Sequence, residues 1–226
     1  MIRRIATVPD GIIRQRTPKR GLTRETIVVL LCGLLGGAGF GYVMIEALNA
    51  VETDNSMFQV QLLGRVLRPV VLTVVAWLLY SVVAHFVANS SGGRGPISRL
   101  MRGAAWAMIP IGIWNVLRSL VVAFLFFGVD IPTEPEGLSA AEQAASVYTG
   151  TAAGGEDVYA GLADPLYAIS LLVGIVFVVW SGHLLSVAVA ESKDLDIDTA
   201  RRAAAVPAAL FALYLLVTGL GQAGIL

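Results

Sequence analysis

The sequence predicts an all-α membrane protein, a bundle of five transmembrane helices with a cytoplasmic N-terminus and an external C-terminus. Three observations lead to this class. Of the 226 residues, 56% are hydrophobic and only 14% are charged, which leaves too little polar surface to cover a water-soluble core. Five apolar stretches are each long enough to cross a bilayer. The connections between them alternate in charge.

The five predicted spans divide the chain into two parts. A membrane-crossing helix needs about 20 mostly apolar residues, and the stretches that qualify are roughly 27–48, 66–88, 104–128, 165–190 and 203–224. Residues 1–25 form a basic cytoplasmic tail, and residues 26–226 form the five-span domain, with an acidic external loop at 129–164. The first apolar run lacks a small-x-small cleavage site, so it does not resemble a signal peptide.

The positions of Lys and Arg outside the spans give the orientation. The tail and the connections after spans two and four are basic, whereas residues 129–164 contain acidic side chains and no Lys or Arg. Basic connections of membrane proteins face the cytoplasm. The first connection carries Glu52 and Asp54, and only Arg65 at its end runs against the pattern. The cell membrane is therefore the expected location, with the tail inside.

Several local signals predict helix ends. Asp164-Pro165 places a capping acid before a proline at the first helical position, and Asp198-Thr199 predicts a similar start for the fifth span. Ser139-Ala-Ala-Glu142 matches a capping box and predicts a short surface helix near residues 139–148. Pro110 is expected to interrupt the third span, where neighbouring helices must satisfy the freed backbone groups.

A stripe of small residues runs along the first span. Gly33, Gly37 and Gly41 recur every four residues, and such a stripe lets another helix backbone approach closely in lipid. The sequence leaves two interpretations open: a dimer interface, or packing against another span of the same chain.

Arg118 is the most informative residue inside a span. It lies about 21 Å along the third span from its cytoplasmic end, at 1.5 Å per residue, and shares a helix face with Trp114 and Asn115. An arginine at this depth is costly unless it has a partner or extends to the headgroups. One hypothesis is a structural ion pair between Arg118 and Glu46 of the first span. The alternative is snorkelling to the outer headgroups.

The rest of the sequence shows no motif of a catalytic, cofactor-binding or metal site. His85 and His183 lie at similar depth, but two ligands do not close a metal site. The single cysteine, Cys32, lies inside an apolar run. We therefore predict no enzyme activity, no cofactor and no metal, and the zero net charge gives no sign of nucleic-acid binding. Lys19 and Lys193 are the only lysines among 16 basic residues, a bias that suits a salt-loving prokaryote such as a halophilic archaeon.

Two stretches resemble the Yip family of five-span membrane proteins, first known for interacting with Rab GTPases. The first is His85-Phe86-Val87 through Ser91-Gly92-Gly93-Arg94-Gly95, leading to Leu100, Ala104, Ala105 and Pro110. The second is Trp180-Ser181-Gly182-His183 through Glu191, followed by Ala203 to Pro207. The resemblance covers most of the chain from about Leu22 and implies a membrane-organising or trafficking-like role. The family supplies no catalytic or binding residue for transfer.

Two functions are compatible with these patterns. The first is a non-enzymatic membrane scaffold or membrane-organising protein that acts through contacts with lipids, with other membrane proteins or with copies of itself. The alternative is a small transporter or the membrane subunit of a transport complex. A transporter predicts a polar cavity near mid-membrane that is lined by Asn115, Arg118 or the histidines, whereas a scaffold predicts a packed bundle.

Overall fold

The computed structural model describes residues 21–50, 56–129, 131, 139–149 and 160–222. This part of the chain contains five apolar helical spans, whose most apolar 18-residue windows have mean hydropathies of 1.8 to 2.2. The helices are α2 (Thr23–Ala50), α3 (Ser56–Ser90), the consecutive pair α4 (Ile97–Ala107) and α5 (Ile109–Leu125), α7 (Pro165–Lys193) and α8 (Ile197–Gln222). The predicted five-span, all-α fold is confirmed.

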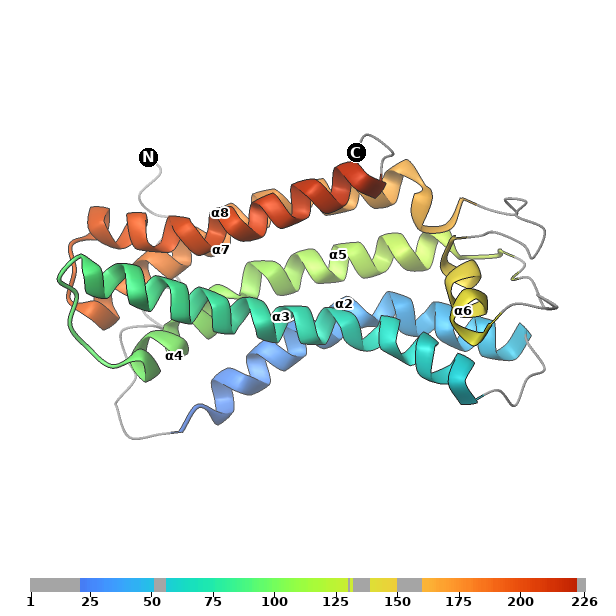
Figure 1. The fold of residues 1–226 in the computed structure, drawn as a ribbon, viewed down its shortest axis with the longest axis horizontal. Coiled ribbons are helices and arrows are strands. Elements are labelled where there is room, and N and C mark those ends of the chain that lie inside the picture. Colours follow the sequence, from blue (N-terminus) through green and yellow to red (C-terminus); the bar gives the residue numbers. More distant parts are fainter. Residues whose placement is uncertain (1–20, 51–55, 130, 132–138, 150–159, 223–226) are drawn as a thin grey trace.

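The spans lie side by side along the long axis of the molecule (Figure 1). The short helix α6 (Ala140–Thr149) lies across one end, which we call the α6 end. The opposite end carries the turn 91–96 between α3 and α4 and the turn 194–196 between α7 and α8, and we call it the turn end. The charge pattern of the sequence predicts that the turn end faces the cytoplasm.

The second span differs most from its predicted range of 66–88, because α3 already begins at Ser56. The third span also departs from its predicted range of 104–128. Pro96 stands at the N-cap, so the helix begins at Ile97. At the other end α5 stops at Leu125, and Gly128 adopts a positive φ of 72° that favours glycine. Most of the basic tail and much of the acidic loop lie outside the described residues.

Pro110 interrupts the third span as predicted. The helix is interrupted at Met108, between α4 and α5. Pro110 occupies the first turn of α5, where its missing N–H costs least. The Ser181 hydroxyl of α7 donates a hydrogen bond of 2.6 Å to the carbonyl oxygen of Ala107. A neighbouring helix therefore satisfies a backbone acceptor at the break, as lipid surroundings require.

The helix caps follow the predictions with one correction. Asp164 caps α7 by accepting from Leu166 N at 2.7 Å. The capping box of α6 also forms, since Glu142 Oε2 accepts from Ser139 N at 2.8 Å and from its hydroxyl at 2.6 Å. At α8, however, Asp196 accepts from the backbone N–H groups of both Asp198 and Thr199. The cap is thus two residues earlier than predicted, and Asp198 lies in the first turn.

The short helix α6 is fixed to the bundle by Tyr148, which is 1% exposed. Its ring lies 5.8 Å from Phe40 of α2 and 6.3 Å from Phe126 at the end of α5. The Arg65 guanidinium of α3 lies 5.5 Å from the same ring centroid. These contacts tie the loop helix to three different spans, because aromatic and cation–π pairs add to apolar burial.

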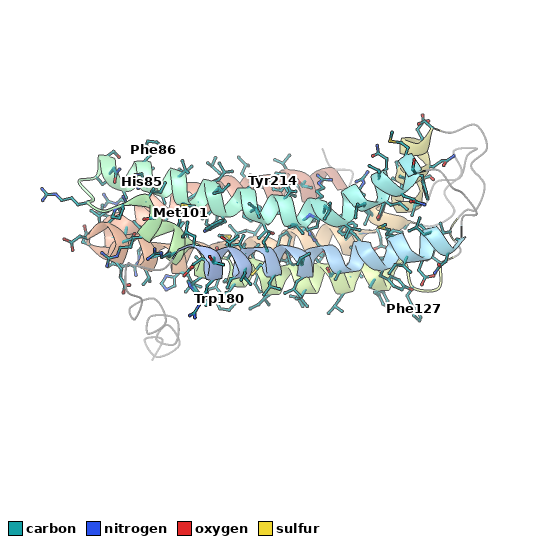
Figure 2. All side chains as sticks on the ribbon, turned by 90° about the horizontal axis from the view of Figure 1, so that it is seen from below. His85, Phe86, Met101, Phe127, Trp180 and Tyr214 are labelled. Atoms are coloured by element: carbon teal, nitrogen blue, oxygen red, sulfur yellow. The ribbon has the colours of Figure 1, made fainter. Side chains whose placement is uncertain are left out.

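The outside of the bundle is apolar along its length (Figure 2). Phe86 near the turn end is 68% exposed and Phe127 near the α6 end is 79% exposed. Many Leu, Ile and Val side chains between them are also more than a third exposed. A continuous apolar surface of this kind requires a lipid environment, because soluble monomers rarely expose large apolar patches.

Lys193 ties the two turns together at the turn end. Its fully buried ammonium donates to Asn89 Oδ1 at 2.9 Å and to the carbonyl oxygen of Gly95 at 2.6 Å. Its own carbonyl oxygen accepts from Arg94 N at 2.8 Å. The lysine thus joins the end of α7 to the turn after α3.

Candidate functional site

The Arg118 side chain points into the bundle. It is only 8% exposed, and its guanidinium carbon lies 5.0 Å from the Trp114 ring and 5.9 Å from the Phe40 ring. Its Nε atom is buried without a hydrogen-bond partner in the described part of the chain. Arg118 lies seven residues before the end of α5, about 10 Å from that end. The snorkelling alternative would require the guanidinium to lie at the headgroup boundary instead.

Asn115 fixes the position of this helix face. Its Nδ2 atom donates to the Cys32 carbonyl oxygen at 2.8 Å and lies 3.4 Å from Thr73 Oγ1. Gly36 makes this possible, since a Cβ added there would lie 2.8 Å from Asn115 Cγ. The amide therefore joins α2, α3 and α5, a role that polar side chains often have between membrane helices.

Glu46 lies apart from Arg118. The carboxylate is on an exposed part of α2, six residues beyond Phe40 and hence about 9 Å further along the helix axis. Both residues are described, and no ion pair within 4 Å joins them. The guanidinium lies against aromatic rings in this arrangement, and the Arg118–Glu46 pair stays a prediction.

Arg118 lines a cavity of about 100 Å³ in the α6 half of the bundle. Side chains from α2, α3, α5, α7 and α8 surround it, including Asn115 and the hydroxyl-bearing Tyr167 and Tyr214. Two further arginines of α3, Arg65 and Arg68, also line it. No carboxylate lines this cavity within the residues that the structure describes. The cavity is therefore partly polar, and the charged side chains that line it within the described residues are all basic.

An apolar groove of about 270 Å³ continues from the cavity along α3 and α8 toward the turn end. Leu72, Phe211 and Tyr214 line both spaces. The rest of the groove is formed mainly by aliphatic side chains from Val75 to Val83 of α3 and from Pro207 to Leu210 of α8. Tyr214, on this face of α8, is 39% exposed, so the groove opens toward lipid (Figure 2).

The predicted glycine stripe contacts a helix of the same chain. A Cβ added at Gly33 would lie 2.7 Å from Val70 Cα, and one added at Gly37 would collide with the backbone of Val66. At Gly41 the nearest atom, a methyl of Val66, would be 4.0 Å away. The first two glycines therefore support the interpretation of packing within the chain, against α3.

The remaining candidates are not brought together. His85 lies 3.0 Å from the Asn89 amide, and His183 is exposed on α7. Among the described residues no three His, Cys, Asp or Glu side chains form a group that could hold a metal ion.

Sequence reasoning found Arg118, Trp114 and Asn115 but missed the two arginines of α3. Arg65 drew attention only as an exception to the charge pattern. The available signal was the spacing of Arg65 and Arg68, which places them on one face of a helix at the start of an apolar stretch. What the sequence did not reveal is that this face meets the Arg118 face.

Five apolar spans around a mainly hydrophobic interior with a few buried polar side chains define a polytopic α-helical membrane protein. The Yip1 domain matches residues 7–221 of the chain. The chain thus belongs to the Yip1 domain family, and the predicted resemblance is confirmed. Comparison with curated proteins and with solved structures found no match for this chain.

Proposed function

We propose that this Yip1-domain protein is a non-enzymatic membrane-organising scaffold of the cell membrane, with its N-terminus in the cytoplasm. It acts through contacts of its outer helix faces with lipids and with other membrane proteins or copies of itself. The observation that carries the proposal is the close packing of the interior in the turn half. There, buried side-chain donors link the helices, as Trp77 does between α3 and α4 and Ser181 does between α7 and α4.

Two tryptophans illustrate this packing. Trp77 of α3 donates through Nε1 to the Met101 carbonyl oxygen of α4 at 2.9 Å. Trp114 of α5 donates to the Ser170 carbonyl oxygen of α7 at 2.8 Å. Both rings are at most 5% exposed. Trp77 fills the interior of the turn half, whereas Trp114 forms part of the cavity wall beside Arg118. A bundle fixed by such bonds suits a protein whose partners dock on its outside.

Purification in native lipid, followed by cross-linking and mass spectrometry, tests this function. We expect one stoichiometric protein partner, or self-association of the chain, together with bound lipid. Recovery of a monomer with nothing but a small bound solute would refute the scaffold proposal.

The polar cavity lined by Asn115 and Arg118 favours the transporter as a second candidate. A transporter requires a path on both sides of its site, so the decisive measurement is flux. Protein reconstituted in vesicles should move labelled chloride or phosphate no faster than protein-free vesicles if the scaffold proposal holds. Flux that is lost in Arg118→Gln and kept in the exposed-site control Arg99→Gln would establish the transporter instead.

A further inference from the structure

We infer that the cavity and groove form one binding site for an anionic phospholipid of the leaflet at the α6 end. The lipid phosphate would occupy the cavity beside Arg118, and one acyl chain would lie in the groove between α3 and α8. This inference deepens the lipid part of the proposed function and rests on it.

The positive charge of the cavity is the first argument for a bound phosphate. Arg65, Arg68 and Arg118 all line a space of about 100 Å³. A water molecule occupies about 30 Å³ of liquid, so the space is large enough for a phosphate group. Arg118 is more than nine-tenths buried and leaves Nε without a partner. A buried cation without a counter-charge is costly in a membrane, and guanidinium groups match the geometry of phosphate oxygens.

The neighbouring hydroxyl groups point to the same chemistry. Tyr167 and Tyr214 line the same cavity as Arg118. A phenol can donate to a phosphate oxygen. Asp164, the acid nearest to this wall in sequence, uses Oδ1 to cap α7. The described surroundings therefore offer an anion several donors.

The length of the groove carries the second step. It runs along α3 from Leu72 to Val83, which is about 16 Å at 1.5 Å per residue. The hydrocarbon core of a bilayer is about 30 Å thick, so the groove is about as long as one leaflet is deep. Its polar end meets the cavity and its apolar end extends along α3 and α8 toward the turn end, so a headgroup in the cavity and an acyl chain in the groove can belong to one lipid.

The source of the anion can be tested with purified full-length protein in a neutral detergent. Native mass spectrometry and thermal unfolding would be measured with phosphatidylglycerol, with phosphatidylcholine and with inorganic phosphate. We expect one tightly retained phosphatidylglycerol and a raised unfolding temperature with that lipid only. An equal effect of phosphatidylcholine would overturn the charge argument, and an equal effect of inorganic phosphate would replace the lipid by a free anion.

Variants locate the lipid. Charge-assisted hydrogen bonds contribute about 1.5–3 kcal/mol, so Arg118→Gln should weaken phosphatidylglycerol binding at least about tenfold, whereas Arg99→Gln at the turn end should not. The double variant Arg65→Gln with Arg68→Gln, at more exposed positions, gives the same test if Arg118→Gln does not fold. Equal binding by these variants and Arg99→Gln would overturn the site.

Two leucines of α8 provide a variant and a matched control that test the groove. Leu210 lines it and is 58% exposed, whereas Leu213 on the same helix is 55% exposed and does not line it. Leu210→Trp should displace the acyl chain and weaken lipid binding, and Leu213→Trp should not. If lipid binding fails in these experiments while cross-linked partners persist, only this inference falls. If lipid binding holds and no partner or self-association is found, the scaffold proposal falls.

Discussion

Replacing Gly39 by alanine should loosen the contact between α2 and α5. A Cβ at this position would lie 2.9 Å from the Ser119 Cα and closer still to its carbonyl oxygen. These are backbone atoms, so the two helices must separate. Gly41→Ala is the matched control, because its added Cβ would meet only a methyl of Val66 at 4.0 Å. Both substitutions raise helix propensity by the same amount, about 1 kcal/mol, which cancels in the comparison.

The magnitude follows from two terms. Overpacking a well-packed contact costs about 1–3 kcal/mol. Separation of the helices would also lengthen the bond of 2.6 Å from the Ser119 hydroxyl to the Leu35 carbonyl oxygen, and such bonds contribute about 0.6 kcal/mol within membranes. Gly39→Ala should therefore be about 2–4 kcal/mol less stable than Gly41→Ala.

Unfolding in mixed micelles, followed by circular dichroism as the fraction of sodium dodecyl sulfate increases, measures this difference. Coinciding unfolding curves for the two variants would refute the reasoning, since the structure gives their added methyl groups very different surroundings. Loss of a cross-linked dimer in Gly41→Ala alone would instead assign this part of the glycine stripe to self-association.

Three further predictions concern charged groups. If the predicted ion pair forms, Glu46→Arg and Arg118→Glu should each lower the stability of the protein, and the variant that carries both should regain it. A double-mutant cycle in which the two losses of stability simply add would reject the pair. Hydrogen bonds from Ser139 lower the pKa of Glu142. The stability that these bonds give to α6 is therefore fully present above the ordinary carboxyl pKa and is lost as the pH falls through the lowered value. Amide exchange in α6 should become faster over that pH range in the native chain and not in Glu142→Gln. Lys193→Met leaves the acceptors at Asn89 and Gly95 without their donor, which should lower the free energy of unfolding by about 1–3 kcal/mol. Amide exchange in the turn 91–96 should become faster. Unchanged exchange would show that the lysine does not hold the turn.

The fold was predictable because lipid imposes simple requirements on a sequence. Apolar length defines a span, and a buried backbone must be hydrogen-bonded within a helix. Local signals were equally direct where one residue suffices. Asp164 before a proline, and Ser139 three residues before Glu142, each carry their partner nearby in sequence. The α8 cap was misplaced because Asp196 and Asp198 are equally suitable acids, and only the turn geometry selects between them.

The site was harder to predict because it depends on which helix faces meet. The position of Arg118 deep in the third span identified it as unusual. That position alone was equally compatible with an ion pair to Glu46 and with a side chain that extends to the lipid headgroups. The contact of Arg118 with the aromatic ring of Phe40 was not predictable, since a cation–π contact leaves no charge signal in the sequence. The glycine stripe showed a similar limit. Its spacing predicted close approach, and the structure adds that Gly39, outside the stripe, makes the closest approach to α5.

The break at Met108 gives the two leaflets different surroundings for one span. On the turn side α4 packs mainly against α7 and α3, whereas beyond the break α5 packs mainly against α2 and α7. The third span thus exchanges one neighbour at the break, close to the middle of its length. Each half of the membrane therefore meets a bundle with its own cross-section, joined to the other at the hydrogen bond between Ser181 and Ala107.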